Sequence, residues 1–397
     1  MLVQPLDDKG NCVGYYADGQ LVYEPMPDSV SGTWGYSRHF NDMGVHYAQL
    51  YCDGQGIGSV CPEHLRDNWT EVCAKMKAYL VSFDEGKVAV NDHCFFNLVP
   101  ERFLLEFFDA KQRITEHVLE SYPKPDNYNF LVDLSRSLDA MSQRKLNLDL
   151  NVLKSRIAEK RVRDFWKKMN RGQTHIRYNV FGTKTGRLTT KKNSFPILTL
   201  DSGFRSVIKP TNDWLVELDF NAAELRTLLA LSGNEQPRED IHQWNMKNVF
   251  SDDMTRDEAK KKIFSWLYNP KALNKEAESV YNRVKVVEEY HNEGRVKTIF
   301  GREIQADQHH ALNYIIQSTT SDLFLRQMCK VDKLLEGRKT SLAFCIHDSL
   351  VLDMAEEDRE LLPEILKTFS NTELGEYVIN VSAGKDFGNL TRLNWTQ

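Results

Sequence analysis

The chain has 397 residues with a formal net charge of −5, and 41% of its residues are hydrophobic against 27% charged. This composition is typical of a folded, water-soluble protein, and no apolar run approaches the roughly 18–20 residues of a membrane span, which excludes a membrane-embedded class. The length predicts two or three domains, and the N-terminus lacks the basic and apolar segments of a secretory signal, so we expect a cytoplasmic protein.

Residues 1–95 are predicted to form a small, strand-rich α/β region. Asp-Gly pairs beginning at Asp18 and Asp53 separate β-prone runs, which is the usual pattern of a hairpin. Cys61, His64, His93 and Cys94 are residue types that bind a structural zinc, but two Cys-x-x-Cys-like pairs are missing, which favours ordinary buried thiols.

Helical periodicity follows over 101–120, 129–142 and 150–170. The last helix enters a basic segment, in which thirteen Lys or Arg residues between Lys154 and Lys192 stand against two Asp or Glu residues. The aromatic residues interleaved with them are Phe165, Trp166, Tyr178 and Phe181. Such a segment is typical of a surface that follows a nucleic-acid backbone, although a solvated helix surface has a similar composition.

Two predicted strand ends carry an acidic residue. The run 214–219 predicts a strand that ends at Asp219, and the runs 341–347 and 349–354 predict a hairpin with Asp348 at its tip. Paired carboxylates on neighbouring strands are the minimum that holds two Mg²⁺ ions side by side. Aspartates are also common in ordinary turns, so the spacing alone leaves both interpretations open.

A four-residue repeat of functional side chains marks the segment after Thr255, a predicted helix N-cap. Arg256, Lys260, Phe264 and Tyr268 recur at intervals of four and therefore lie on one face of a helix. Two cations followed by two aromatic rings suit a ligand with a phosphate end and a base end. An amphipathic core helix with extended Lys and Arg stems has the same spacing.

Together these elements resemble DNA polymerase family A, the bacterial polymerase I class. Asp219-Phe-Asn-Ala-Ala-Glu-Leu-Arg226 is similar to motif A, the helix after Thr255 to motif B, and Cys345-Ile-His-Asp348 to motif C. The resemblance implies a DNA-directed DNA polymerase that adds deoxynucleotides to a primer 3′-hydroxyl by two-metal nucleotidyl transfer.

By this resemblance, Asp219, Asp348 and the backbone carbonyl of Phe220 bind two Mg²⁺ ions, with Mn²⁺ as a substitute. Glu224 is the steric gate that excludes a ribose 2′-hydroxyl.

The same resemblance assigns the nucleotide contacts. Arg256 and Lys260 bind the triphosphate, and Lys260 protonates the pyrophosphate leaving group. Phe264 lies against the sugar and Tyr268 near the templating base. An Asp-Ile-His sequence ending at His242 resembles a further phosphate-binding element of the family.

The resemblance also implies contacts to primer–template DNA. Arg187, in a Thr-Gly-Arg-Leu-Thr-Thr sequence, reads the minor groove at the primer end. Asn313 and Gln317, one helical turn apart, contact template and duplex, and His347 approaches the primer terminus. Phe-Gly-Arg ending at Arg302 matches a further family element.

The chain departs from the family pattern at several positions. Ser265 and Asn269 replace glycines near the motif B tyrosine, and Ser349 stands where the family usually has Glu. Ser349 also matches single-subunit RNA polymerases, the nearest alternative, whereas Glu224 and Phe264 favour the DNA polymerase. A non-catalytic, polymerase-derived DNA-binding accessory factor is the second alternative.

The implied fold is α+β, a right hand of thumb, palm and fingers with an antiparallel palm sheet and a small N-terminal α/β appendage. The expected order is the appendage at 1–95, a helical thumb at 96–184, palm at 185–232, fingers at 233–325 and palm again at 326–397.

A family A exonuclease requires a strand with Asp-x-Glu and later aspartates, and residues 1–95 contain no Asp-x-Glu triplet. We therefore expect no proofreading in this chain. The expected partners are primer–template DNA, dNTPs, and a separate exonuclease or replication protein. The compact length suits a phage or plasmid replication system, which would place a phage-encoded enzyme in the host cytoplasm.

Overall fold

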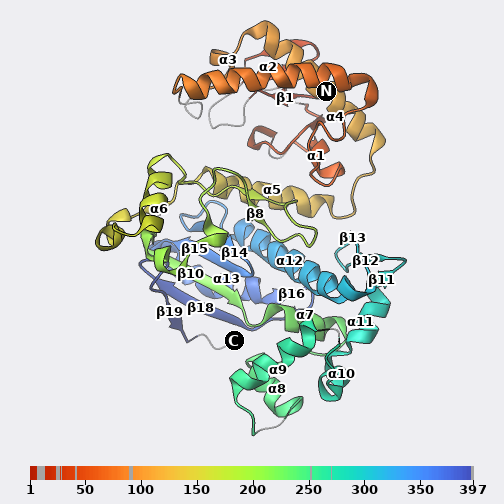
Figure 1. Cartoon of the computed structure of the whole chain (residues 1–397), viewed down its shortest axis with the longest axis vertical. Coiled ribbons are helices and arrows are strands. Elements are labelled where there is room, and N and C mark those ends of the chain that lie inside the picture. The colour runs from red at the N-terminus through yellow and green to blue at the C-terminus, as the bar shows by residue number, and fades with distance from the viewer. Residues whose placement is uncertain are drawn as a thin grey trace. The chain divides into compact units, whose positions relative to one another are not determined.

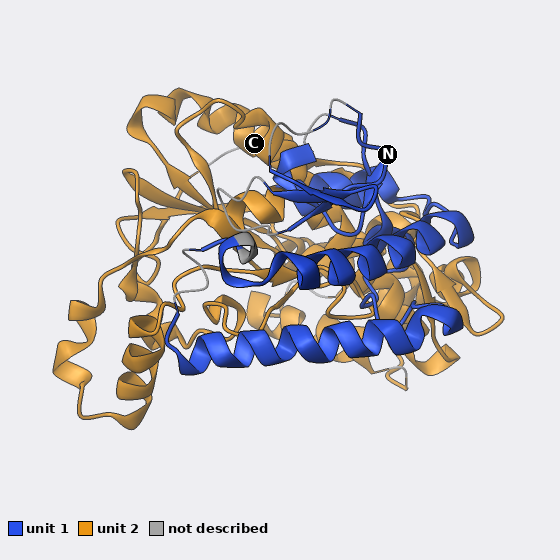
Figure 2. Cartoon of the chain, turned by 90° about the horizontal axis from the view of Figure 1, so that it is seen from above, with its two compact units in different colours: residues 1–136 blue, residues 137–397 orange. Residues whose placement is uncertain are grey.

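The computed structural model describes residues 1–6, 14–23, 27, 29–40, 43–88, 93–250, 253–269 and 271–394. The chain forms two compact units, residues 1–136 and 137–397, each held together by contacts among its own residues (Figure 2). Both helices and strands are present, as expected for an α+β fold (Figure 1). Within the described ranges, no helix combines the length and apolar character required to cross a membrane.

Two long helices form the framework of the first unit: α2 (Arg66–Glu85) packs along α4 (Glu101–Ser121). The shorter elements are β1 (Gln4–Pro5), β2 (Tyr15–Ala17), β3 (Gln20–Val22), β4 (Gly32–Thr33), β5 (His46–Tyr47), α1 (Ala48–Tyr51) and α3 (Phe95–Leu98). Helix α4 confirms the periodicity predicted for 101–120, because Phe103, Phe108 and Ile114 on one face are buried.

The two Asp-Gly turns of this unit have different outcomes. Asp18 and Gly19, both with positive φ, connect the antiparallel strands β2 and β3, which confirms the first hairpin. The second hairpin prediction was wrong. Asp53 and Gly54, also with positive φ, follow α1, and the Gly54 amide donates to the carbonyl of Gln49 at 2.9 Å. Positive φ ends a helix as readily as it closes a hairpin, so the dipeptide alone does not distinguish the two.

Helix α5 (Tyr128–Gln143) begins in the first unit and ends in the second, and it matches the helix expected over 129–142. The helix expected over 150–170 is interrupted. A 3₁₀ segment, η4 (Leu150–Arg156), precedes α6 (Lys160–Asn170), and Glu159 has an extended backbone between them. The Glu159 carboxylate accepts hydrogen bonds from Arg156 at 2.8 and 3.1 Å, which fixes this break in the helix.

A five-stranded antiparallel sheet in the order β14-β15-β10-β18-β19 organises the second unit. Its strands are β10 (Trp214–Phe220), β14 (Ser341–Ile346), β15 (Ser349–Met354), β18 (Ile379–Gly384) and β19 (Thr391–Leu393). The bounds of β10, β14 and β15 confirm the three strands predicted from the sequence, whereas β18 and β19 were not predicted. The small strands of this unit are β6 (Asn147–Leu148), β7 (Tyr178–Asn179), β8 (Thr189–Thr190), β9 (Ile208–Lys209), β16 (Asn371–Thr372) and β17 (Gly375–Glu376).

The two faces of the sheet differ because side chains alternate along β10. Val216, Leu218 and Phe220 are buried on one face, whereas Glu217 and Asp219 are partly exposed on the other. The Phe220 ring stacks on Phe369 with centroids 4.4 Å apart. Phe369 lies in α13 (Leu362–Ser370), which packs against the long helix α12 (Gln308–Leu334). Helices therefore cover one face, and the polar face, defined by Glu217 and Asp219, carries the candidate site.

A helical subdomain follows β10 along the chain. Its elements are α7 (Ala223–Leu231), α8 (Ile241–Asn248), α9 (Arg256–Tyr268), α10 (Lys275–Tyr281), α11 (Arg283–Tyr290), β11 (His291–Asn292), β12 (Arg295–Lys297) and β13 (Glu303–Gln305). Its core contains Trp266, fully buried against Tyr281 with ring centroids 6.0 Å apart. Helices α8 and α9 pack together (Figure 1).

Candidate active site

Asp219 lies on the central strand of the sheet, with a polar neighbour on each side. It is paired with Ser349 of β15 and with Asn380 of β18. Directly opposed residues of an antiparallel pair project from the same face, so all three side chains share the polar face. The Asn380 amide donates to Asp219 Oδ2 at 3.2 Å and accepts from Arg392 Nη2 at 2.9 Å. This chain of hydrogen bonds orients the Asp219 carboxylate.

Asp348 follows His347 in a two-residue turn that connects β14 to β15. The paired residues Ile346 and Ser349 close this turn, and His347 has φ of 52°, in the left-handed region. Because Ser349 is opposite Asp219, the turn places Asp348 at the Asp219 end of the sheet. The structure thus brings the two predicted metal ligands to one end of neighbouring strands.

Both carboxylates have raised pKa values. Burial raises the pKa of Asp219 to about 6; the Asn380 hydrogen bond opposes this effect, and the charges of Glu217 and Asp348 reinforce it. Burial also raises the pKa of Asp348, against the attraction of Arg187 and with the repulsion of Glu224. Like charges close together disfavour ionisation, and a divalent cation relieves that repulsion. Oxygen donors of this kind suit Mg²⁺.

Glu224 joins two other predicted residues, Arg187 and Tyr268, from different parts of the chain. It lies in the first turn of α7, is only 8% exposed, and accepts a hydrogen bond from Arg187 Nη2 at 2.5 Å. Its other oxygen accepts the hydroxyl of Tyr268, the last residue of α9. Burial and this bond to Glu224 raise the pKa of Tyr268, so the phenol remains a donor. The charge of Glu224 acts on Asp348 and the charge of Asp348 acts on Tyr268, which couples this cluster to the carboxylates.

Helix α9 presents the predicted stripe on its exposed side. Thr255 and Glu258 form a reciprocal capping box, which confirms the expected N-cap. The buried residues Ala259, Ile263, Trp266 and Leu267 occupy the other side of the helix. Of the stripe, Arg256, Lys260 and Tyr268 are exposed and Phe264 is half-buried. The Phe264 and Tyr268 rings stack with centroids 5.8 Å apart.

Asp240, the N-cap of α8, forms an ion pair with Arg256 in this structure. It accepts from Arg256 Nε at 3.1 Å and Nη2 at 2.7 Å, and from the Asn221 amide at 2.9 Å. Burial alone would raise the pKa of Asp240, but the bonds from Arg256 and Asn221 outweigh it and hold the pKa well below its ordinary value. One predicted phosphate ligand is therefore already paired with a carboxylate.

His242 lies beside this pair but is almost fully buried, with 3% exposure. Its ring centroid lies 5.6 Å from that of Phe264, and its Nδ1 atom has no hydrogen-bond partner within the part of the chain that the structure describes. Burial lowers the pKa of His242 to about 4, with Arg256 and Lys260 contributing and Asp240 opposing. The imidazole is therefore neutral near pH 7.

A buried ion pair lies against the loop that carries Arg187. Arg302 donates to Asp322 on α12 at 3.0 and 2.7 Å, and the Asp322 side chain is 1% exposed. Gly186, with φ of 77°, lies so close that a Cβ there would meet the Arg302 guanidinium at 2.5 Å. Arg302 therefore leaves no room for a side chain at Gly186, the residue that precedes Arg187.

Asn313 and Gln317 lie on α12, half-buried and one turn apart, as the sequence predicts. Neither is hydrogen-bonded to the Asp219 or Glu224 clusters within the described residues. Sequence reasoning missed the supporting residues Asn380, Asp240 and Asp322. Asp240 and Asp322 fall inside stretches that resemble the family, whereas Asn380 has no local signal.

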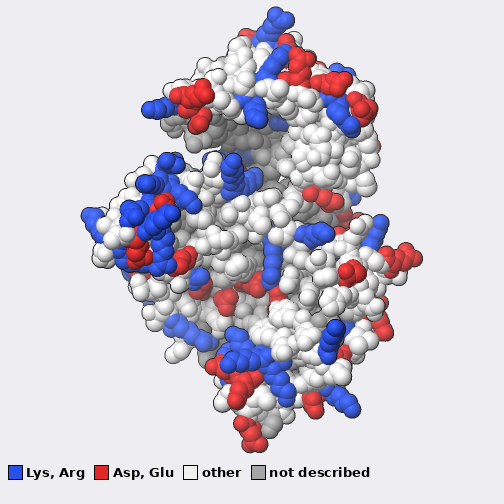
Figure 3. All heavy atoms as spheres, viewed as in Figure 1, with Lys and Arg blue, Asp and Glu red and all other residues white. Residues whose placement is uncertain are grey.

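Basic side chains gather over the α6 segment on the face shown in Figure 3, with a few acidic ones among them. The residues concerned include Lys160, Arg161, Arg163, Lys167 and Lys168. Part of this charge is neutralised, because Arg161 pairs with Glu159 at 2.8 Å and with Asp201 at 3.2 Å. The exposed remainder is free to attract a polyanion.

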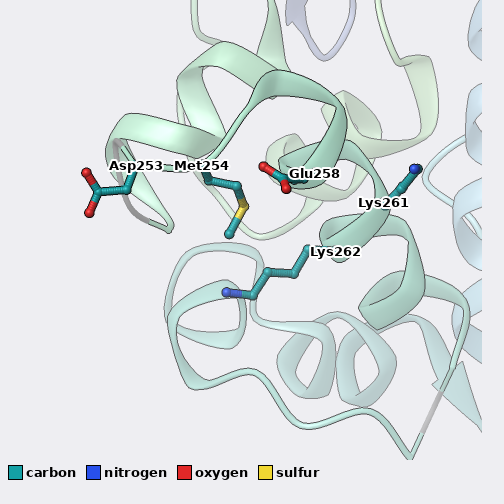
Figure 4. A pocket seen from close by; sticks show the side chains of 5 residues that line it. All are labelled: Asp253, Met254, Glu258, Lys261 and Lys262. Atoms are coloured by element: carbon teal, nitrogen blue, oxygen red, sulfur yellow. The ribbon is translucent and has the colours of Figure 1, made fainter.

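A surface pocket of about 620 Å³ also involves α9 (Figure 4). Its lining residues are Asp253, Met254, Glu258, Lys261 and Lys262. It shares none of the residues of the Arg256-to-Tyr268 stripe, so it is separate from the candidate site.

Comparisons with known proteins show similarity to DNA polymerases. The model of DNA polymerase family A matches residues 271–388. The thermostable DNA polymerase I of Thermus aquaticus is 28% identical over 247 residues, which cover 49% of this chain and 30% of that protein. DNA polymerase I of Chloroflexus aurantiacus is 24% identical over 269 residues, covering 55% of this chain and 29% of that protein. The chain thus spans less than a third of the length of these relatives.

Among solved structures, the chain is similar to the polymerase domain of Pol1 from M. smegmatis, in complex with a DNA primer-template and dNTP. The TM-score is 0.54 at 13% identity, and the match covers 74% of this chain and 76% of that one. At this identity the likeness shows a shared fold.

Proposed function

We propose that the chain is a template-directed DNA polymerase of family A, the family whose model matches residues 271–388, and that it extends a primer 3′-hydroxyl with deoxynucleotides. The observation that carries the proposal is the arrangement of Asp219 and Asp348 at one end of adjacent strands, electrostatically coupled to the Arg187–Glu224–Tyr268 cluster. A pair of carboxylates beside a nucleotide-sized set of aromatic and cationic groups is what nucleotidyl transfer requires.

In this proposal Asp219, Asp348 and the Phe220 carbonyl hold two Mg²⁺ ions, or Mn²⁺ in their place. The placement of Asp219 and Asp348 at one end of neighbouring strands supports the fit, because carboxylate oxygens are ligands that Mg²⁺ prefers. When bound, such ions lower the pKa of the primer hydroxyl and stabilise charge on the triphosphate. The chain itself fixes the carboxylate geometry through the turn at Asp348 and the Asn380 hydrogen bond.

The exposed stripe of α9 is proposed to bind the incoming nucleotide. Arg256 and Lys260 take the triphosphate, Lys260 donates a proton to the leaving pyrophosphate, Phe264 lies against the sugar, and Tyr268 lies near the templating base. Since Arg256 is paired with Asp240 here, triphosphate binding requires Arg256 to exchange one anionic partner for another. His242, proposed as a further phosphate contact, serves as a neutral hydrogen-bonding group.

Glu224 is proposed as the steric gate. Its carboxylate is held from both sides by Arg187 and Tyr268, so it cannot easily turn away from a 2′-hydroxyl. A side chain with restricted rotation rejects an extra hydroxyl more strongly than a mobile one does.

The DNA contacts remain proposals as well. Arg187 reads the minor groove, Asn313 and Gln317 contact template and duplex, and His347 approaches the primer end. The Pol1 domain with a similar fold is in complex with a DNA primer-template and dNTP, which supports DNA as the partner of these residues.

We assign the parts of the hand in chain order to an appendage at 1–95, a thumb at 96–184, palm at 185–232, fingers at 233–325 and palm at 326–397. The unit boundary after residue 136 falls within the proposed thumb. Residues 1–95 contain no Asp-x-Glu triplet, and we propose that the chain polymerises without proofreading. A separate exonuclease or replication protein, and a phage origin with action in the host cytoplasm, complete the proposal.

A primer-extension assay tests the function. Purified protein is incubated with a 5′-labelled primer–template and Mg²⁺, with dNTPs, with rNTPs or with no nucleotide, beside Asp348→Ala. We expect extension with dNTPs only, lost in the variant, and no shortening of the primer without nucleotide. Extension with rNTPs would favour the RNA polymerase alternative, primer shortening would reveal a nuclease, and no extension would favour the accessory role.

A further inference from the structure

Glu217 is a carboxylate on the polar face that no motif assigns. It lies two residues before Asp219 on β10, so both side chains project from the same face. Glu217 is half-buried, and its charge contributes to the raised pKa of Asp219. The candidate metal ligand therefore has a second acidic neighbour besides Asp348.

A hydrogen bond from across the sheet fixes Glu217. The Ser349 hydroxyl donates to Glu217 Oε1 at 2.8 Å, and Ser349 is itself paired with Asp219. Ser349 and Glu217 are thus diagonal neighbours on adjacent strands. Ser349 also follows Asp348 directly in the chain. It therefore contacts Glu217 and is adjacent to both proposed metal ligands, Asp219 across the sheet and Asp348 along the chain.

Position 349 is also where the chain departs from the family, which usually has Glu after the motif C aspartate. The chain has a serine and not a carboxylate at this point of β15, and it carries a carboxylate at the diagonal position on β10. Ser349 with Glu217 places one negative charge on this part of the face. Glu at position 349 with a neutral residue at position 217 would place the same number there.

The geometry indicates how Glu217 acts. Within the described residues, no group of three or more His, Cys, Asp or Glu side chains is placed to hold a metal ion directly. Magnesium keeps several water ligands, and those waters donate to nearby carboxylates. A carboxylate held one position back from Asp219 is suited to that outer role.

We propose that Glu217, oriented by Ser349, is the third carboxylate of the metal site and strengthens cation binding through metal-bound water. This inference rests on the proposed polymerase function for its biological meaning, but it makes a separate claim about cation affinity. Glu217 is a positioning residue, because it acts on the ions through water and not as a direct ligand.

The test measures Mn²⁺ affinity of the purified full chain without DNA or nucleotide, by the electron paramagnetic resonance signal of free Mn²⁺. The variants are Glu217→Gln, Ser349→Ala and the exchange Glu217→Ser with Ser349→Glu. Asp219→Asn identifies the site, and Glu376→Gln, an exposed acid on β17, is the charge-matched control. Thermal unfolding without metal shows that each variant is folded.

We expect Glu217→Gln to weaken Mn²⁺ binding about tenfold, as loss of an outer-shell partner typically does. Ser349→Ala should weaken it less, the exchange variant should recover most of the affinity, and Glu376→Gln should not change it. Unchanged affinity in Glu217→Gln, or Mn²⁺ binding that Asp219→Asn does not alter, would overturn the inference. If Glu217→Gln fails to fold, the exchange variant decides, because affinity well below wild type would contradict relocation of the charge.

Primer extension by the same preparations separates the two claims. Glu217-dependent Mn²⁺ binding without extension by the wild-type chain would count against the polymerase function and support the carboxylate role. Primer extension without any effect of Glu217→Gln on Mn²⁺ affinity would support the polymerase function and count against the carboxylate role.

Discussion

Arg256 and Asp240 form a bidentate ion pair between the start of α9 and the N-cap of α8, with N–O distances of 3.1 and 2.7 Å. The same carboxylate caps α8 through the amides of His242 and Gln243. One side chain thus fixes a helix start and a proposed triphosphate ligand together. Any change in the pairing of Arg256 is therefore transmitted to the first turn of α8.

Asp240→Ala is expected to lower the free energy of unfolding by about 2 kcal/mol, because it removes a helix cap and leaves Arg256 and Asn221 without their shared acceptor. Urea unfolding measures the change. Asp257→Ala is the matched control, since Asp257 lies 3.7 Å from Arg256 but is 82% exposed. The control should lower the free energy of unfolding by less than about 0.5 kcal/mol. Equal losses in the two variants would show that the Asp240 contacts do not stabilise the fold more than an exposed ion pair does.

His242 should give a measurable pH dependence of stability. Its pKa is lowered to about 4 in the folded chain, chiefly by burial, against about 6.5 for an exposed imidazole. As the pH falls below about 6.5, the unfolded chain binds a proton that the folded chain does not, so stability decreases until the pH reaches about 4. Unfolding free energies of the wild type and His242→Gln across this range test the effect. Parallel curves would contradict it.

The Glu224 contacts predict the effect of opening the gate. Glu224→Ala should reduce discrimination against ribonucleotides by about 10- to 100-fold, because the anchored carboxylate no longer occupies the space of a 2′-hydroxyl. Single-nucleotide incorporation with dNTP and rNTP measures the ratio. Tyr268→Phe keeps the ring but removes the hydrogen bond to Glu224, and we expect a smaller loss of discrimination. No change in either variant would exclude Glu224 as the gate.

Gly186 offers a test of the loop next to Arg187. Gly186→Ala combines a left-handed backbone with a Cβ at 2.5 Å from the Arg302 guanidinium, so it should destabilise the fold by more than about 2 kcal/mol. Gly172→Ala is the control, because Gly172 has φ of 87° but open space around it, and it should cost only about 1 kcal/mol. Thermal unfolding compares the two. Similar losses of stability in the two variants would mean that the Arg302 side chain moves aside without an energetic penalty.

Local patterns predicted the elements that carry the candidate site. The strand ending at Asp219, the hairpin tip at Asp348 and the helix stripe after Thr255 depend on short-range alternation or spacing, and all three are confirmed. The Asn380 partner of Asp219 was not predictable in this way, because it is 161 positions away and depends on which strands pair. The hydrogen bond of Ser349 to Glu217 is of the same kind.

The basic segment shows a second limit of sequence patterns. Phe165 and Tyr178 alternate with cations as nucleic-acid-binding aromatics do, but the structure buries both. Phe165 stacks on Phe204 with centroids 5.0 Å apart, and the Tyr178 hydroxyl donates to the Cys345 carbonyl at 2.6 Å and accepts its amide at 2.9 Å. Tyr178 therefore supports the strand that leads to Asp348. Composition does not distinguish a stacking surface from a core that lies beneath exposed cations.

The left-handed backbone of His347 has a consequence for how this chain evolves. A two-residue hairpin with positive φ at its first central position usually has glycine there, and a side chain in that conformation costs about 1 kcal/mol. Selection for thermal stability alone would replace His347 with glycine. With the role proposed for His347 at the primer end, histidine at this position exchanges stability for activity, so libraries screened only for heat resistance will tend to discard it.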